Sequence, residues 1–169
     1  RLTPTAVLGP GGGAALSFSQ ITGGYNYTCG LSSGAAYCWG SDGGQIGINS
    51  MAGGNYLTPT AVLGPGGGGA LTYTSISAAY DHVCGLTATG KAYCWGNNNN
   101  AMIGDNTTGN VRYAPTAVLG PGGGGALVFD SITTSYNNTC GFAGNAAYCW
   151  GSGSSGMIGD NTTGTNRLT

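Results

Sequence analysis

The stretch VCGLTATGKAYCWG, Val83–Gly96, decides how this chain folds, because similar stretches lie on either side of it. The first copy reads TCGLSSGAAYCWG at Thr28–Gly40, and the third reads TCGFAGNAAYCWG at Thr139–Gly151. In each copy two short apolar runs, each with one cysteine, flank a turn rich in Gly, Ser, Thr or Asn. This pattern is typical of a β-hairpin with one cysteine on each strand.

The hairpin belongs to a longer repeat that fills the chain. Its tryptophan recurs after 56 and then 55 residues, at Trp39, Trp95 and Trp150. The phrase PTAVLGPGGG opens each unit. A fixed period of this length indicates stacked supersecondary units. We therefore divide the chain into repeats at residues 1–56, 57–113 and 114–169, which together form part of a larger ring or array.

Each unit reads as short strands between turns. PTAVL is strand-like, and GPGGGG is a protruding loop, because glycine disfavours regular structure and proline removes a donor. Residues Ala70–Ile76 alternate in the way a strand requires, and the hairpin follows. No window shows a sustained period of 3.6 residues, so we expect an all-β chain with essentially no helix.

The cysteines form one pair in each unit, and each pair flanks one turn. Cross-strand neighbours in a hairpin come close to disulfide reach. We predict the bridges Cys29–Cys38, Cys84–Cys94 and Cys140–Cys149. Free buried thiols and a zinc site are the alternatives, although the spacing is not that of a zinc knuckle and His82 is the one histidine.

The strand AYCWG has two apolar faces. Alternation places Tyr37 and Trp39 on one face of a strand and Cys38 on the other. If Cys38 bonds across to Cys29, one face carries the bridge and the other carries aromatic rings. Such a sheet needs neighbours on both sides, which is the environment of a propeller blade.

The ordered set YCWG, a following Ile-Gly step (Ile46-Gly47, Ile103-Gly104, Ile158-Gly159) and a downstream PTAV resembles the regulator of chromosome condensation (RCC1-like) repeat, in a cysteine-containing extracellular form. The resemblance covers nearly the whole chain and implies a β-propeller with four-stranded blades. Three units are fewer than the roughly 4–8 blades of a closed ring. Further repeats, a second chain or an open array would cover the remaining faces. The nuclear exchange and chromatin roles of the family fit neither disulfides nor low charge, and we do not transfer them.

Composition limits the location and the partners. Charged residues make up 5% of the chain and the net charge is −1, so we expect no nucleic-acid partner. No apolar run approaches the roughly 20 residues of a membrane-spanning helix. Disulfides form in oxidising compartments, which predicts a secreted or cell-surface protein.

No motif predicts catalysis, a metal or a cofactor. Asp81-His82 is the one acid–histidine neighbour pair, but adjacent strand residues point to opposite faces, so we expect a surface or inter-blade histidine. The loop GDNTTG, at Gly104–Gly109 and Gly159–Gly164, offers one carboxylate per copy, which is few for calcium. GPGGGG lacks the lysine and the strand–helix setting of a phosphate loop.

Four Asn residues occupy N-x-[S/T] sequons, and glycans there would solubilise a weakly charged surface. Asn106 and Asn161 lie at the same loop position in two units. A glycan is harder to accommodate at Asn26 and Asn137, which lie beside the strand that carries the cysteine. The recurring tryptophan indicates core packing rather than sugar stacking.

These observations predict a non-enzymatic extracellular glycoprotein module that serves as a structural scaffold or interaction surface, in a matrix or filament. The expected partners are further repeats or copies of the same chain, glycans or other extracellular proteins. A secreted lectin or protein inhibitor that uses a loop face of the propeller is the alternative.

Overall fold

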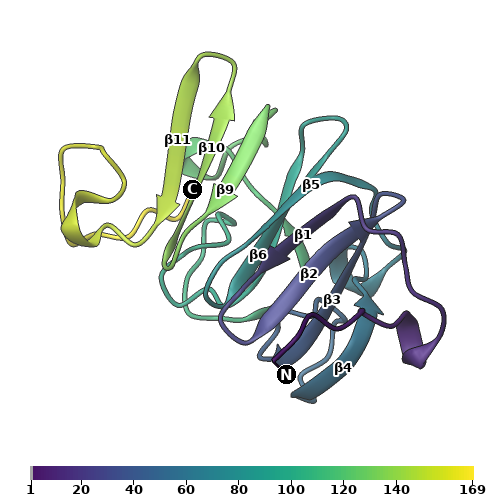
Figure 1. Ribbon diagram of the computed structural model, residues 1–169. Coiled ribbons are helices and arrows are strands. Elements are labelled where there is room, and N and C mark those ends of the chain that lie inside the picture. Colours follow the sequence, from purple (N-terminus) through teal and green to yellow (C-terminus); the bar gives the residue numbers. More distant parts are fainter. Residues whose placement is uncertain (1) are drawn as a thin grey trace.

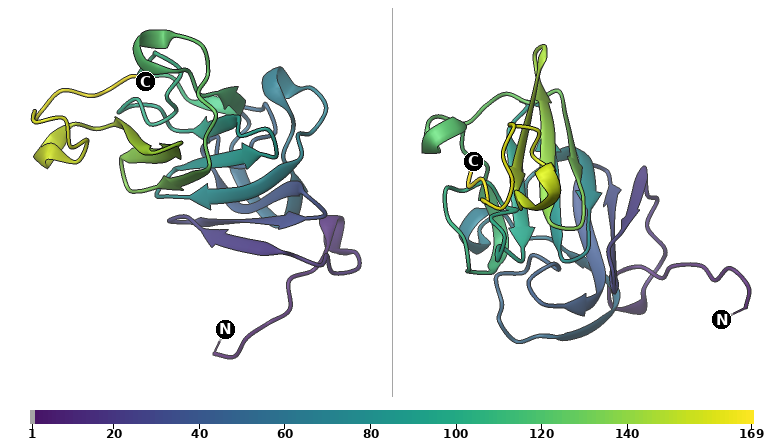
Figure 2. Two further views of the ribbon diagram at one scale, coloured as in Figure 1. Left: turned by 90° about the horizontal axis from the view of Figure 1, so that it is seen from above. Right: turned by 90° about the vertical axis from the view of Figure 1, so that its left-hand side faces the viewer.

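The computed structural model describes residues 2–169 and is built from β-sheets (Figure 1). Three antiparallel sheets, each made of strands consecutive in the sequence, stand side by side like blades of a fan (Figures 1 and 2). In the part of the chain that the structure describes, helical structure is confined to 3-10 turns of three residues. The prediction of an all-β chain of propeller blades is confirmed.

The elements repeat from sheet to sheet. The first sheet contains β1 Gln20–Gly23, β2 Tyr27–Ser32, β3 Ala35–Asp42 and β4 Gly54–Ala61. The second contains β5 Tyr73–Ala78, β6 His82–Thr87, β7 Ala92–Gly96 and β8 Arg112–Ala117. The third contains β9 Ser131–Thr134, β10 Asn138–Ala143 and β11 Ala146–Gly151. The 3-10 turns are η1 Pro10–Gly12, η2 Pro65–Gly67, η3 Pro121–Gly123 and η4 Ser154–Gly156.

A disulfide joins the two strands of every central hairpin. The two cysteines of each hairpin lie directly opposite each other in the strand register, with their Cα atoms 4.1 Å apart in all three cases. The structure therefore contains one bridge per sheet, and no cysteine of the described chain is free: the pairs are Cys29–Cys38, Cys84–Cys94 and Cys140–Cys149.

Both faces of the second sheet are buried against neighbours. The side that carries Trp95 packs into a core shared with the first sheet. The opposite side, with Cys84 and Cys94, packs into a core shared with Phe129 and Trp150 of the third sheet. The alternation along AYCWG thus supplies a separate apolar surface to each neighbour.

The tryptophans of the second and third sheets also each donate a hydrogen bond to the sheet before them. The indole N–H of Trp95 donates to the carbonyl of Gln45 at 2.8 Å, and that of Trp150 donates to the carbonyl of Met102 at 2.9 Å. The Ile-Gly step follows these carbonyls. A Cβ at Gly104 would lie 2.6 Å from the Trp150 indole nitrogen, and its φ is +75°. Glycine is required there by both space and backbone conformation.

The innermost strands β1, β5 and β9 are joined by side chains that bind the next blade's backbone. The Gln20 amide accepts from the N–H of Ile76 at 3.0 Å and donates to its carbonyl at 2.7 Å. Ser77 continues this pattern, because its hydroxyl accepts from the N–H of Thr134 at 3.0 Å. These bonds satisfy backbone groups that an exposed edge strand would leave open.

His82 is buried between the second and third sheets. Its Nε2 lies 3.0 Å from the Thr139 hydroxyl, which donates its own proton to the carbonyl of Met102 at 2.9 Å. The hydroxyl can therefore only accept from His82, so Nε2 carries a proton. Burial lowers the pKa of His82 to about 3. The expectation of an inter-blade histidine is met.

The fourth strand of a sheet comes from the phrase that opens the next repeat. The strand β4 contains Pro59–Ala61, and β8 contains Pro115–Ala117. The first copy of the phrase, at Pro4–Leu8, was also expected to be a strand, and that prediction is wrong. A strand needs a paired neighbour, and the strand that pairs with this phrase elsewhere, β3 or β7, precedes it in the chain.

The strand expected at Ala70–Ile76 begins later, at Tyr73, and ends at Ala78. The residues before it bind the first sheet instead of β6. Thr72 bridges to Ala35, and the N–H of Tyr73 donates to the carbonyl of Gly34 at 2.8 Å. The preceding GPGGG segments form the expected turns at η1, η2 and η3.

We predict that the bridge of the second sheet contributes more to stability than the bridge of the third. Replacing Cys84 and Cys94 by alanine should lower the free energy of unfolding by about 2–3 kcal/mol through lost loop closure, with a further loss from the vacated core. The double alanine variant of Cys140 and Cys149 is the matched control. The bridge that it removes closes a loop of similar length, but lies on a face that no neighbouring sheet covers. Denaturant titration measures both, and equal losses would contradict the buried role of the central bridge.

We also predict an acid-sensitive stability due to His82. Because its folded pKa lies below its unfolded value, the unfolded chain binds the extra proton, and stability falls as the pH drops below about 6.5. The loss should reach about 2 kcal/mol between about pH 7 and pH 5, above the titration range of ordinary carboxylates. His82→Asn, which introduces the residue at the matching position of the third repeat, should flatten the profile. A profile unchanged by this substitution would exclude His82 as the cause.

Candidate functional site

The acidic and basic residues considered for chemistry are engaged with the protein's own groups. Asp81 and His82 point in different directions: one carboxylate oxygen of Asp81 accepts from the Asn97 amide at 2.7 Å, whereas His82 binds Thr139. Burial raises the pKa of the Asp81 carboxyl. Across residues 2–169, no three His, Cys, Asp or Glu side chains gather in a way that would hold a metal ion.

The two GDNTTG loops are closed by an Asp–Thr–Arg clamp. The guanidinium of Arg112 donates to Asp105 at 2.6 Å, and the hydroxyl of Thr107 donates to the same carboxylate at 2.5 Å. Asp160 is held in the same way by Thr162 and Arg167. The Thr162 hydroxyl, followed by Arg167, lowers the pKa of Asp160. The clamp was not predicted from the sequence, although in both copies an arginine follows the aspartate by seven residues.

The Asp–Thr–Arg clamp argues against calcium binding by these loops. In each loop the carboxylate already accepts bonds from a cationic arginine and from a threonine hydroxyl. A hard cation prefers several free oxygen ligands, so the observed contacts favour a structural role for the loop.

The sequon asparagines differ in accessibility. Asn26, Asn106 and Asn161 are exposed, and Asn137 is half-buried. Asn106 faces the next repeat's glycine turn, since a Cβ added at Gly123 would lie 2.8 Å from its side-chain nitrogen.

Three tyrosines form a column at one end of the inner strands. Tyr25, Tyr80 and Tyr136 each follow an inner strand by two residues, and the centroids of successive rings are 4.5 Å apart. Tyr25 is 65% exposed and Tyr136 is 59% exposed. This column was not predicted from the sequence, although a tyrosine recurs two residues before the His82 position in all three repeats.

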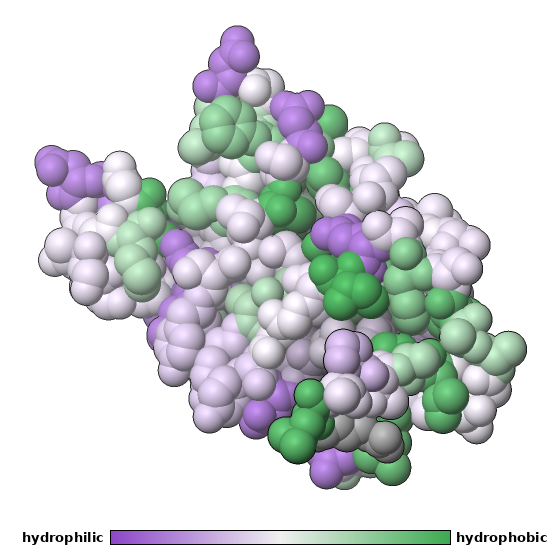
Figure 3. All heavy atoms as spheres, in the orientation of Figure 1, coloured by the Kyte–Doolittle hydropathy of each residue, from purple (hydrophilic) through white to green (hydrophobic). Residues whose placement is uncertain are grey.

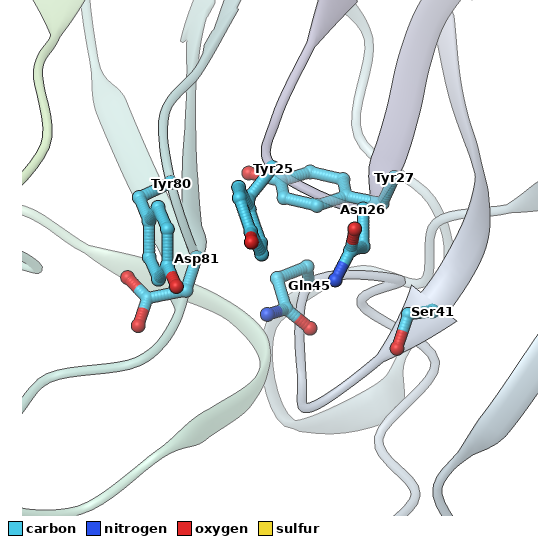
Figure 4. Close-up of a pocket in the computed structure, with 7 residues that line it drawn as sticks. All are labelled: Tyr25, Asn26, Tyr27, Ser41, Gln45, Tyr80 and Asp81. Carbon is cyan, nitrogen blue, oxygen red and sulfur yellow. The ribbon is translucent and has the colours of Figure 1, made fainter.

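A pocket of about 230 Å³ lies beside this column, between the first and second sheets (Figure 4). Its deepest ring is that of Tyr27, whose hydroxyl lies 2.8 Å from the His82 carbonyl and 3.0 Å from the Ala79 carbonyl. Polar side chains surround the ring, and one buried oxygen of Asp81 has no partner. The lining residues are Tyr25, Asn26, Tyr27, Ser41, Gln45, Tyr80 and Asp81.

The third sheet presents a second hollow, of about 480 Å³, on the face that carries its disulfide. Phe142 in this hollow is 51% exposed, whereas the leucines at the matching positions, Leu31 and Leu86, are 2% and 5% exposed. Ala147 is also exposed, although its counterparts in the first two sheets are buried. In Figure 3, green apolar atoms over this sheet lie among pale and purple ones.

The first sheet presents the complementary surface. Phe18 packs on Trp39 with ring centroids 5.6 Å apart, and on Tyr37 edge-to-face at 6.5 Å. The same aromatic pair recurs as Tyr73–Trp95 and Phe129–Trp150, where the preceding sheet covers it. The two ends of the fan therefore expose the two surfaces that meet at each internal junction.

No helix in residues 2–169 is long and apolar enough to cross a membrane.

Comparisons with known proteins agree with this architecture. Residues 73–101 match the family model of the regulator of chromosome condensation (RCC1) repeat. A search of curated proteins finds no match.

Solved structures share the fold. Yeast RCC1 (Prp20), in a complex with Kap60, aligns with a TM-score of 0.75 and 22% identity over 90% of this chain and 36% of its own length. Human WBSCR16 aligns with a TM-score of 0.72 and 18% identity over 90% of this chain and 37% of its own. The ectodomain of the receptor kinase CR4 from Physcomitrella patens gives 0.50 and 27% identity over 88% and 34%.

The chain thus spans about a third of the proteins with which it aligns. Residues 73–101, within its second unit, match the family model, and 90% of the chain aligns with the fold of yeast RCC1. The chain has the fold of β-propeller blades and is similar to RCC1 repeat proteins.

Proposed function

We propose that the protein is a non-enzymatic, extracellular interaction scaffold that works by joining its end blades to further blades of the same kind. The repeats at residues 1–56, 57–113 and 114–169 act in this proposal as one partial propeller. The observation that carries it is the exposed disulfide face of the third sheet. Residues at the same positions of the other two sheets are core residues.

The physical reason is the hydrophobic effect. An exposed apolar face whose equivalents in the other two sheets are buried in a core favours an interaction site. Nearly complete burial of a side chain such as Phe142 contributes about 1.5–3 kcal/mol. With so few charges on the surface, little opposes the approach of a second apolar face.

Two further observations support this proposal, the first its location outside the cell and the second its interaction role. Three disulfides in a chain of this size are typical of oxidising compartments. One protein with a similar fold is a receptor-kinase ectodomain, and another, yeast Prp20, is described as binding Kap60, Gsp1p and histones. A fold used for binding other proteins suits an interaction role, although the partners need not be the same.

We further propose glycans at Asn161 and Asn106, and at Asn26 and Asn137 where space allows. Asn161 is exposed in a loop held by the Asp160 clamp, and no residue contacts its side chain by hydrogen bonding in the described structure. Sugars there would leave the end faces of the fan open.

The scaffold role predicts concentration-dependent self-association of the 169-residue chain. Sedimentation velocity over a concentration series should show dimers or longer assemblies, and Phe142→Glu should weaken association at least about tenfold by placing a charge in the apolar face. Ala88→Glu is the matched control, since Ala88 is exposed in the hairpin turn of the second sheet, between β6 and β7 and away from both end faces. A wild-type chain that stays monomeric at high micromolar concentration would contradict the scaffold role.

The tyrosine pocket favours a second candidate function, the binding of a neutral sugar. Its polar lining of Asn26, Ser41 and Gln45 beside exposed aromatic rings provides both hydrogen bonds and apolar contact. Saturation-transfer NMR with a panel of mono- and disaccharides should show contact that Tyr25→Ala abolishes and Tyr113→Ala retains. If no sugar receives saturation from the protein, or if both variants abolish the transfer, this pocket is not a sugar site.

A further inference from the structure

We propose that Tyr80 and Tyr136 form a dityrosine cross-link when a peroxidase acts on the protein with hydrogen peroxide. The link joins the second and third sheets covalently at the end of the inner strands, where the tyrosine column lies. This modification site goes beyond the proposed scaffold function and does not depend on self-association. The three disulfides favour an oxidising compartment, the setting in which such a reaction takes place.

The rings of the column are already held next to each other. The centroids of Tyr80 and Tyr136 are 4.5 Å apart, with the ring planes inclined by 48°. Tyr25 stacks on the other side of Tyr80, also at 4.5 Å, and the hydroxyls of these two rings lie at the same end (Figure 4). Two phenols held in this way need little movement before their ortho carbons meet, which is the advantage of proximity in a coupling reaction.

The hydroxyls of the column are not needed for the packing of the blades. Tyr27, which is buried nearby, uses its hydroxyl to bind the carbonyls of Ala79 and His82. Within residues 2–169, no such hydrogen bond joins a hydroxyl of the column to the backbone. Phenylalanine rings would stack equally well, so packing alone does not account for a phenol at all three positions.

Oxidation of Tyr80 also requires a proton acceptor. Burial and the neighbouring phenols of Tyr136 and Tyr25 raise the pKa of Tyr80, so the ring is a neutral phenol at neutral pH. The Asp81 carboxylate lies beside the Tyr80 hydroxyl, and its charge raises that pKa further (Figure 4). One Asp81 oxygen accepts from Asn97, and the other is buried without a partner in the described structure. The second oxygen is therefore placed to take the proton that Tyr80 releases.

The reaction is a two-electron oxidation. Each phenol loses one electron and one proton, and the proton of Tyr80 passes to Asp81 while that of Tyr136 passes to solvent. The two phenoxyl radicals join through carbons ortho to their oxygens, and the hydrogen on each joined carbon then moves to the oxygen and restores the phenol. Hydrogen peroxide takes up the two electrons and two protons and becomes two water molecules. The cross-linked protein has therefore lost two hydrogen atoms.

The test treats the full chain with a heme peroxidase and hydrogen peroxide, at a concentration where the chain is monomeric. After reduction of the disulfides, trypsin cleaves at Lys and Arg and places Tyr80 in peptide 2–91 and Tyr136 in peptide 113–167. Mass spectrometry should find these two peptides joined and the intact chain lighter by two hydrogen atoms. A link between Tyr25 and Tyr80 would instead stay within peptide 2–91.

Three variants assign the link. Tyr80→Phe keeps the stacked ring but cannot form the radical, so the joined peptides should disappear. Tyr113→Phe lies in the same peptide as Tyr136 but outside the column, and as the matched control it should retain them. Asp81→Asn introduces the residue that the other two repeats carry at this position, and it should slow the joining at least about tenfold by removing the proton acceptor. Thermal melts check that all three variants fold.

Several results would overturn the proposal. These are the absence of a link, joined peptides that persist in Tyr80→Phe, and covalent dimers that form without a link inside the chain. An unchanged rate in Asp81→Asn would remove Asp81 from the reaction. The reduced and unfolded chain should give a spread of linked peptides, and the same single pair there would show that the folded column is not the cause. Because the reaction is run on monomers, its failure leaves the scaffold function standing.

Discussion

Each blade of this protein has two apolar faces, and the rest of the structure depends on covering both. The constraint originates in one strand, AYCWG, where alternation sends cysteine to one side and aromatic rings to the other. A sheet with a single apolar face packs once and leaves the other side to water. The second sheet here instead contributes to two separate cores, one with each neighbour. Stacking is therefore the way in which each unit becomes stable, and the disulfide fixes the hairpin that presents both faces.

The same constraint explains the polar contacts between blades. Trp95 and Trp150 are buried, and their indole N–H groups need acceptors, which the carbonyls before the Ile-Gly steps provide. Gln20 and Ser77 bind the backbone of the neighbouring inner strand. These contacts fix the spacing and register of successive blades, which apolar packing alone leaves less defined. The tyrosine column at the end of the inner strands is a consequence of that regular spacing.

The sequence was most informative where contacts are local. Hairpins, bridges and the alternation along AYCWG lie within about a dozen residues, and the repeat showed which features recur. The column of Tyr25, Tyr80 and Tyr136 joins residues about 55 positions apart, and nothing in one repeat states that their rings meet. The clamp of Asp105 by Arg112 was overlooked because turn propensity already explained the aspartate. The first PTAVL was misjudged because a strand is defined by its partner, and this copy has none within the described chain.

The central claim is that a blade is stabilised chiefly by neighbours on both faces. Hydrogen exchange followed by mass spectrometry, at a concentration where the chain is monomeric, compares three nearly identical hairpins that differ in their cover. The account predicts that amides of β6 and β7 exchange most slowly, and that those of β10 and β11 exchange much faster despite the same bridge. Equal protection in all three hairpins would show that each blade is stable by itself and would contradict the account.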